Sequence, residues 1–130
     1  MGLRQVLIIT NNPMVKNTNN AEICFVTGDC RHVLYQAFNK VAMGHRLLSH
    51  PLAGSIKPET NPYRSVVLSR LKTGVELSTL AMLERCLEKV EAGIGKRAAA
   101  GNDLSFAQDF QMIDKELLEA AMQSLGERQV

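Results

Sequence analysis

Residues 50–65 combine side chains and backbone groups that could bind an anion. Gly54 permits a tight turn with exposed backbone N–H groups, and Ser55 and Lys57 lie close by in the sequence. Arg64 could hold a carboxylate or a phosphate through two parallel hydrogen bonds. The segment therefore predicts a pocket for a small anionic ligand. Its further hydrogen-bond donors are Thr60, Tyr63 and Ser65.

The same segment has a second interpretation as a rigid connection. Pro51, Pro58 and Pro62 stiffen it, and loops beyond about 12 residues are uncommon in compact domains unless they are functional or disordered. A proline-rich lid that satisfies its own backbone with serine and threonine hydroxyls explains this composition equally well. The sequence leaves both interpretations open.

Two asparagines follow the first expected strand. In doubly wound sheets, ligands lie outside the carboxyl ends of the strands. If the first and third strands are parallel neighbours, Asn11 and Asn12 approach His50 and become part of the anion site. The alternative is that Asn-Asn-Pro forms a local turn through the asparagine side chains.

His50 also supports an enzymatic alternative. With a free pKa of about 6.5, it could act with Lys57 as an acid–base pair on a small anionic substrate. The sequence offers no clear nucleophile to work with it, and a ring that binds loop backbone is the simpler interpretation. His45 and His50 lack a third ligand at the usual zinc spacing. We therefore expect no metal and no cofactor, and we assign no catalytic residue.

The chain has three cysteines, Cys24, Cys30 and Cys86, and no recognisable export signal. Free, reduced thiols are the expectation under these conditions. Cys30 stands where a helix is expected to begin, a position that lowers a thiol pKa and raises its reactivity. No resolving partner is evident for it, which weakens a redox role.

The loop and the N-terminal strand resemble a known family. The run from His45 to Pro58, followed by Thr60 and by residues 62–65, resembles the signature of GrdX-like proteins. The opening IITNNP is similar to the N-terminus of the same family, and the resemblance covers residues 5–95. GrdX-like proteins are encoded with the glycine, sarcosine and betaine reductases of amino-acid-fermenting anaerobes. The resemblance implies an accessory protein that binds a small anionic ligand or a partner protein of that metabolism.

Hydrophobic patterning divides the first half of the chain into strands and a helix. The run Val6-Leu7-Ile8-Ile9 predicts a strand buried on both faces. A helix over residues 30–43, flanked by two strands, makes a βαβ unit whose strands are parallel. These elements predict an α/β fold with a small, mainly parallel sheet of about four strands. The expected strands cover residues 4–10, 21–26, 46–49 and 66–68.

Residues 76–130 predict a helical hairpin added to an α/β core of residues 1–75. One helix begins near Ser78, and a linker over residues 96–103 separates it from a helix that begins near Ser105 and is longer than in the family pattern. Each helix carries an apolar stripe at helical spacing. The two stripes exceed what one face of a small sheet covers, so we expect a homodimer, and a structural adaptor is a third functional alternative. The stripes are Leu80, Leu83, Leu87, Val90 and Ile94, and Phe106, Phe110, Ile113, Leu117 and Ala120.

Composition argues against several classes of protein. The 130 residues carry a net charge of +2, and no apolar run approaches the roughly 18 residues that a membrane span needs. Residues 1–75 hold nine bases and three acids, whereas residues 76–130 hold six bases and ten acids. The basic half suits an anionic ligand, but sparse lysine and arginine clustering and the absence of tryptophan argue against nucleic acid. We expect a cytoplasmic, non-enzymatic binding protein.

Overall fold

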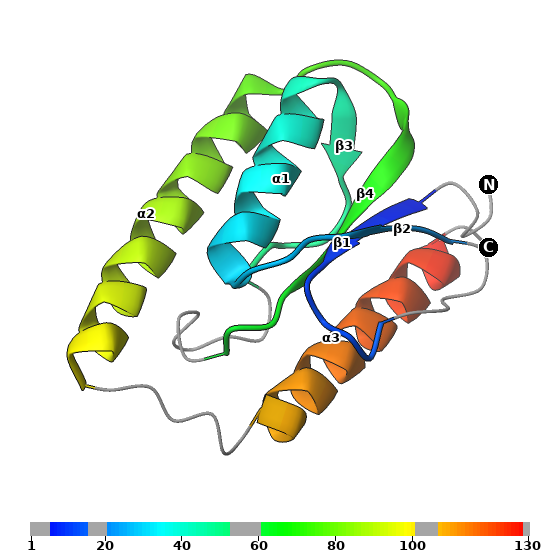
Figure 1. The fold of residues 1–130 in the computed structure, drawn as a ribbon. Helices are drawn as coiled ribbons and strands as arrows, with labels where there is room; N and C mark the ends of the chain where they lie inside the picture. Colours follow the sequence, from blue (N-terminus) through cyan, green and yellow to red (C-terminus); the bar gives the residue numbers. More distant parts are fainter. Residues whose placement is uncertain (1–5, 16–20, 53–60, 101–106, 129–130) are drawn as a thin grey trace.

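The structure is a computed structural model, and it describes residues 6–15, 21–52, 61–100 and 107–128, with side chains left out for residues 95–100 and 127–128. A four-stranded sheet lies between two helices on one face and a single helix on the other (Figure 1). In chain order the elements are β1 (Val6–Thr10), β2 (Ala21–Phe25), α1 (Cys30–Ala42), β3 (His45–Leu47), β4 (Ser65–Lys72), α2 (Leu77–Ala100) and α3 (Ala107–Arg128).

The sheet is mixed, with strand order β2-β1-β4-β3. Strand β1 pairs with β2 in parallel and with β4 antiparallel, and β4 pairs with β3 antiparallel. The expected mainly parallel sheet is therefore wrong. Antiparallel neighbours do not need the helical crossover that a parallel pair requires, and the described residues between β3 and β4 contain no helix. Strands β2 and β3 do point the same way, as the βαβ pattern predicts, but they lie at opposite edges.

The face covered by α1 and α2 has an apolar core. Leu7 and Ile9 of β1 and Leu68 of β4 pack there against both helices. The stripe predicted for α2 is confirmed, because Leu83, Leu87 and Val90 are buried and Leu80 and Ile94 pack partly against the same cluster. Burying each such side chain stabilises the fold by about 1.5–3 kcal/mol.

Helix α1 begins and ends at residues with clear local signals. The Asp29 side chain accepts a hydrogen bond from the backbone of Arg31, and the His32 ring accepts one from the Asp29 N–H, so both ends of a capping box are present. Gly44 follows the helix with φ of 110°, a backbone conformation that residues other than glycine rarely adopt. These contacts fit the helix boundaries expected from the sequence.

Helix α3 packs on the opposite face of the sheet. Its Leu118, Met122 and Leu125 form a second cluster with residues of β1 and β4 that alternate with those of the first core. The structure does not form the expected hairpin, because α2 packs on α1 and α3 lies beyond the sheet (Figure 1). Helix α2 also continues to Ala100, into the segment expected to be a linker.

The buried face of α3 differs from the predicted stripe by one position. Ile113 and Leu117, expected in the core or in a dimer interface, are 48% and 36% exposed, whereas Asp114 is only 5% exposed. The residue that faces the sheet at this point of the helix is therefore a carboxylate and not the apolar side chain that the sequence predicted. Within the described ranges, no helix has the length and apolar character to cross a membrane.

Candidate functional site: a cavity at the sheet edge

Three chain segments meet where β1 and β3 end and β4 begins. Thr10, the last residue of β1, pairs with Ser65, the first residue of β4. Beyond β3, the backbone N–H groups of Leu48 and Ser49 both donate to the Val67 carbonyl, which keeps the chain against β4. Strand β4 lies between β1 and β3, so these two strands are not neighbours as expected. The carboxyl ends of β1 and β3 nevertheless lie at the same end of the sheet, because both strands run antiparallel to β4. This end of the sheet is the edge referred to below.

The Asn11 side chain holds neighbouring segments together through hydrogen bonds to their backbone groups. Its side-chain Nδ2 donates to the carbonyls of Gly28 and Pro62, each at 2.9 Å, and its Oδ1 accepts from the Arg64 N–H at 2.8 Å. Both amide hydrogens are thus used within the protein, and the residue is buried. Asn11, expected to bind a ligand, is instead engaged in holding the segment before β4 against the end of β1.

A polar network of Thr10, Asn12, Ser65 and Asp114 joins α3 to the sheet. The Asp114 Oδ2 atom accepts hydrogen bonds from Ser65 Oγ at 2.7 Å and from Asn12 Nδ2 at 3.0 Å. Asn12 also donates to the Gln111 carbonyl, and Ser65 Oγ lies 2.8 Å from Thr10 Oγ1. Buried polar groups are tolerated when they are paired in this way. The network therefore explains why Asp114 faces the sheet.

Asn12 keeps a local role as well. Its Oδ1 accepts a hydrogen bond from the Met14 N–H at 2.9 Å, which is the asparagine turn foreseen as the alternative to ligand binding. With both amide hydrogens donated to α3 and no exposed surface, the side chain lies behind the site and positions Asp114.

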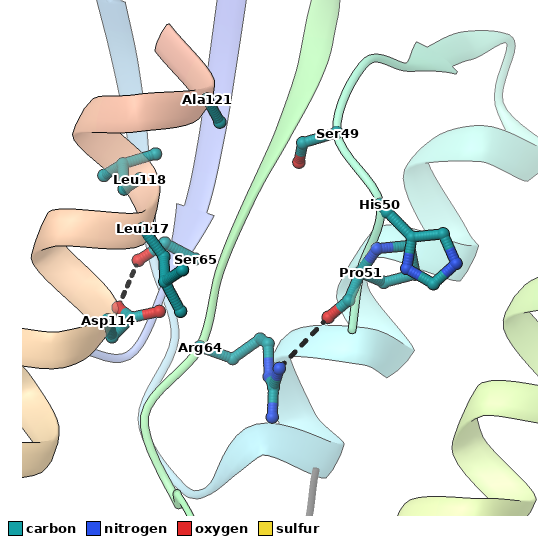
Figure 2. Close-up of a pocket in the computed structure, with 9 residues that line it drawn as sticks. All are labelled: Ser49, His50, Pro51, Arg64, Ser65, Asp114, Leu117, Leu118 and Ala121. Carbon is teal, nitrogen blue, oxygen red and sulfur yellow. Dashed lines mark hydrogen bonds between the residues drawn. The ribbon is translucent and has the colours of Figure 1, made fainter. Parts of the chain in front are cut away.

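A cavity of about 30 Å³ lies beside the polar network, between α3 and the chain that follows β3. Figure 2 shows Ser65, Asp114 and the α3 side chains on one side and Ser49, His50 and Pro51 on the other, with Arg64 below. Its size suits about two or three water molecules or one very small ligand. Its lining residues are Ser49, His50, Pro51, Arg64, Ser65, Asp114, Leu117, Leu118 and Ala121.

Among the described residues, the cavity lining includes the guanidinium of Arg64 and the carboxylate of Asp114, both almost entirely removed from water. Arg64 and Asp114 are each 5% exposed. The Arg64 guanidinium donates from Nη1 to the Pro51 carbonyl at 3.3 Å, which directs it toward the wall opposite α3 (Figure 2). The second oxygen of Asp114, Oδ1, accepts no hydrogen bond from any described residue, and it points toward the middle of the lining residues (Figure 2).

The structure brings only part of the expected anion site together. His50, Arg64 and Ser65 line the cavity. Tyr63 is half-buried and is not among the lining residues. Its backbone N–H donates a hydrogen bond to Asn61 Oδ1. The expected donors that lie outside the described residues are Gly54, Ser55, Lys57 and Thr60.

His50 is exposed, and its Nδ1 accepts a hydrogen bond from the Leu52 N–H at 3.1 Å. This contact corresponds to the simpler interpretation, a ring that binds loop backbone. An acid–base role would need a closed site around a perturbed titratable pair. The described side of the cavity does not enclose His50 in that way.

Asp114 is the charged residue that sequence reasoning missed. It stands next to Ile113 inside an apolar pattern, and counting apolar positions alone assigns the core face to Ile113 and Leu117. The signal was available in the stripe through 114, 118, 122 and 125, which has the same helical spacing and contains one acid. A lone carboxylate within an apolar helical stripe indicates a buried polar contact or a site.

The described residues contain no group of three or more histidine, cysteine or acidic side chains that could hold a metal ion. His45 is buried, and its ring Nδ1 lies 2.8 Å from the Ser69 carbonyl, away from the cavity residues. None of Cys24, Cys30 and Cys86 forms a disulfide. Cys30 does begin α1, but it is 1% exposed, and burial removes it from reagents in solvent.

A second, wider groove lies on the outer surface between α1 and α2. It has a volume of about 550 Å³ and includes Tyr35, Phe38 and three glutamates, of which Glu91 accepts a hydrogen bond from the Tyr35 hydroxyl. That bond raises the pKa of Tyr35 above its ordinary value. The groove is open and its charged groups are exposed, so it lacks the buried polar groups that mark the edge cavity.

Comparison with protein-family models matches residues 7–123 of the chain to the family described as GrdX-like protein. The match includes β1, the edge cavity and most of α3. No curated protein and no solved structure gives a significant match to the chain.

Proposed function

This chain belongs to the GrdX-like protein family, and we propose that it is an accessory protein that binds a small molecule carrying an anionic group in the edge cavity. The observation that supports this most strongly is the position of Arg64, a buried guanidinium beside a cavity. A guanidinium that lines a cavity can hold a carboxylate or a phosphate through strong, charge-assisted hydrogen bonds. An anion in the cavity would provide such an interaction.

Binding without catalysis is the simplest role for these residues. The cavity has fixed hydrogen-bonding groups in Ser49, Ser65 and Asp114, and the contacts of the polar network hold two of them in place. His50 is exposed and bonds to neighbouring backbone. The proposal is therefore a protein that recognises and holds a ligand, with no chemical step assigned.

A role as an adaptor is the second candidate, and exposed apolar residues on α3 favour it. Met112 and Ile113 are 45% and 48% exposed on a helix whose opposite side packs on the sheet. A second copy of the chain or a partner protein of amino-acid reductase metabolism would bury them. The adaptor role does not require the cavity, so the two candidates can be separated experimentally.

A cavity-filling substitution tests the binding proposal. Ala121 lines the cavity from α3, whereas Ala120 is exposed on the same helix. Ala121→Leu places three extra carbons in or beside a space of about 30 Å³; Ala120→Leu makes the same change in solvent. A thermal-shift screen of amino acids, phosphates and nucleotides identifies the strongest small ligand, and calorimetry then measures its affinity for each variant.

We expect Ala121→Leu to weaken that ligand at least about tenfold, equal to 1.4 kcal/mol, and Ala120→Leu to leave its affinity unchanged. Equal affinity for both variants would place the ligand elsewhere on the protein. A screen in which no small molecule raises the melting temperature would contradict the binding proposal and favour the adaptor.

A further inference from the structure

We propose, building on the binding function above, that the edge cavity selects a small zwitterion over a simple anion. The ammonium group of the ligand lies against Asp114 Oδ1, and its carboxylate lies toward Arg64. The inference comes from Asp114, a residue that an anion site does not need.

The first step concerns the charge on Asp114. Its Oδ2 atom accepts two hydrogen bonds from neutral donors, and no lysine, arginine or histidine among the described residues forms an ion pair with it. Buried carboxylates are usually paired with a cation, because neutral donors offset only part of the cost of leaving water. Oδ1 faces the cavity, and no described residue donates a hydrogen bond to it (Figure 2). A positively charged ligand group placed there supplies the missing partner.

The second step concerns the ligand's other end. A phosphate or a plain carboxylate near Arg64 would also lie near the Asp114 carboxylate, since both residues line the same small cavity. Like charges repel more strongly where water is excluded. A molecule with both charges places its anionic group near Arg64 and its cationic group near Asp114, and it adds no net charge to the site.

The third step concerns size. A space of about 30 Å³ holds about two or three water molecules, which favours the smallest molecules that carry both charges. The wall nearest Asp114 is formed by Leu117, Leu118 and Ala121, which offer no polar contact to a longer side chain. Glycine is a small, stable zwitterion of this kind, and it serves as the probe.

Calorimetric titration of the full chain with glycine, acetate and methylammonium separates the two charges. Acetate lacks the ammonium group, and methylammonium lacks the carboxylate. We expect glycine to bind at least about tenfold more tightly than either, because each charge-assisted hydrogen bond contributes about 1.5–3 kcal/mol.

Asp114→Asn sharpens the test. The asparagine oxygen replaces Oδ2 as acceptor for Asn12 and Ser65, and the negative charge is lost. We expect this variant to lose at least about tenfold in glycine affinity while acetate binds as well as before or better. Asp109→Asn, the same change at an exposed position of α3, should bind glycine like the original protein.

Each outcome has a distinct meaning. If acetate or inorganic phosphate binds as tightly as glycine, the zwitterion inference is wrong and the anion-binding function stands. If methylammonium binds as tightly as glycine, Arg64 does not contribute, and both the zwitterion inference and the anion-binding function are wrong. If none of these probes binds, both are also wrong. The comparison of probes on the unmodified protein decides these cases even if Asp114→Asn fails to fold.

Discussion

The two faces of the sheet are built by different physical rules. On the face covered by α1 and α2, the contacts are apolar and the helix stripes follow directly from residue spacing. On the opposite face, α3 places Asp114 among Asn12, Ser65 and Thr10, and its apolar contacts begin only at Leu118. The first face stabilises the fold, and the second combines stabilisation with the formation of a cavity.

The difference shows how a polar contact can set the rotation of a helix. Ile113 and Leu117 are apolar enough to occupy the core, yet they are 48% and 36% exposed. The helix instead turns Asp114 toward the sheet. Because Ile113 is about half exposed, the fold gains only part of the roughly 1.5–3 kcal/mol that its full burial would contribute. Forgoing the rest is consistent with a binding role, because sites often depart from the packing that stability alone favours.

The largest effect is expected on the apolar face. Leu83→Ala removes a fully buried side chain from the α1–α2 core and should lower the free energy of unfolding by about 2–5 kcal/mol through lost burial and a residual cavity. Leu77→Ala, at the 77% exposed start of α2, should change it by less than about 0.5 kcal/mol. Chemical denaturation measures both, and similar losses would mean that α2 is not packed as described.

On the polar face, two substitutions at Asp114 should differ from each other. Asp114→Ala removes the acceptor that Asn12 and Ser65 share and leaves a buried N–H of Asn12 unsatisfied, and it should cost about 2–4 kcal/mol. Asp114→Asn keeps an acceptor and should cost less than about 1.5 kcal/mol. If urea titration gives the two variants the same midpoint, the hydrogen bonds to Asp114 do not determine how α3 is docked.

A smaller effect is expected at the N-terminus of α1. Asp29→Ala removes the helix cap and should cost about 0.5–2 kcal/mol in thermal or chemical unfolding. Burial raises the pKa of Asp29, but hydrogen bonds from the Arg31 side chain and backbone, together with the charges of Arg31 and His32, outweigh burial and lower it below its ordinary value.

The lowered pKa gives this cap a pH dependence with a definite sign. Because the folded-state pKa of Asp29 is below the unfolded value of about 4, the stabilisation is complete above that pH and is lost as pH falls through the folded-state pKa. Asp29→Asn keeps a capping oxygen and should lack this acid-dependent component. Identical acid unfolding of Asp29→Asn and the original protein would exclude the charge contribution.

The smallest effect on stability and a clear effect on assembly are expected at Ile113. We expect the protein to be a homodimer through exposed apolar residues of α3, and Ile113→Lys should yield a monomer at micromolar concentration while monomer stability changes by less than about 0.5 kcal/mol. Gln108→Lys adds the same charge at an exposed position of α3 and should remain dimeric. A monomeric original protein in analytical ultracentrifugation would rule out the dimer.

The sequence predicted those features that depend on local spacing. The buried β1 strand, the cap and end of α1, and the core stripe of α2 follow from apolar periodicity and from single residues such as Asp29 and Gly44. Strand direction was mispredicted because β4 pairs according to contacts with β1 and β3, which no local pattern records. The hairpin was mispredicted because adjacent helices were assumed to pack together.

For the candidate site, part of the set of residues expected from the sequence lies together in the structure. His50, Arg64 and Ser65 line the cavity, since the end of one strand and the start of another limit where they can lie. Asn11 and Asn12 do not line the cavity, and the sequence alone could not show this, because an amide that binds ligand and one that braces backbone look the same in sequence. Asp114 lies 49 residues beyond Ser65, and only the packing of α3 brings it to the cavity.

Chemical-shift mapping of the uniformly ¹⁵N-labelled protein during titration with glycine tests the central claim most directly, because it locates the ligand as well as detecting it. We expect the largest amide shifts at the cavity-lining residues that carry an N–H group, and little change beside the outer groove at Tyr35 and Glu91. These lining residues are Ser49, His50, Arg64, Ser65, Asp114, Leu117, Leu118 and Ala121. Saturable shifts confined to that groove, or none at the edge cavity, would contradict the account.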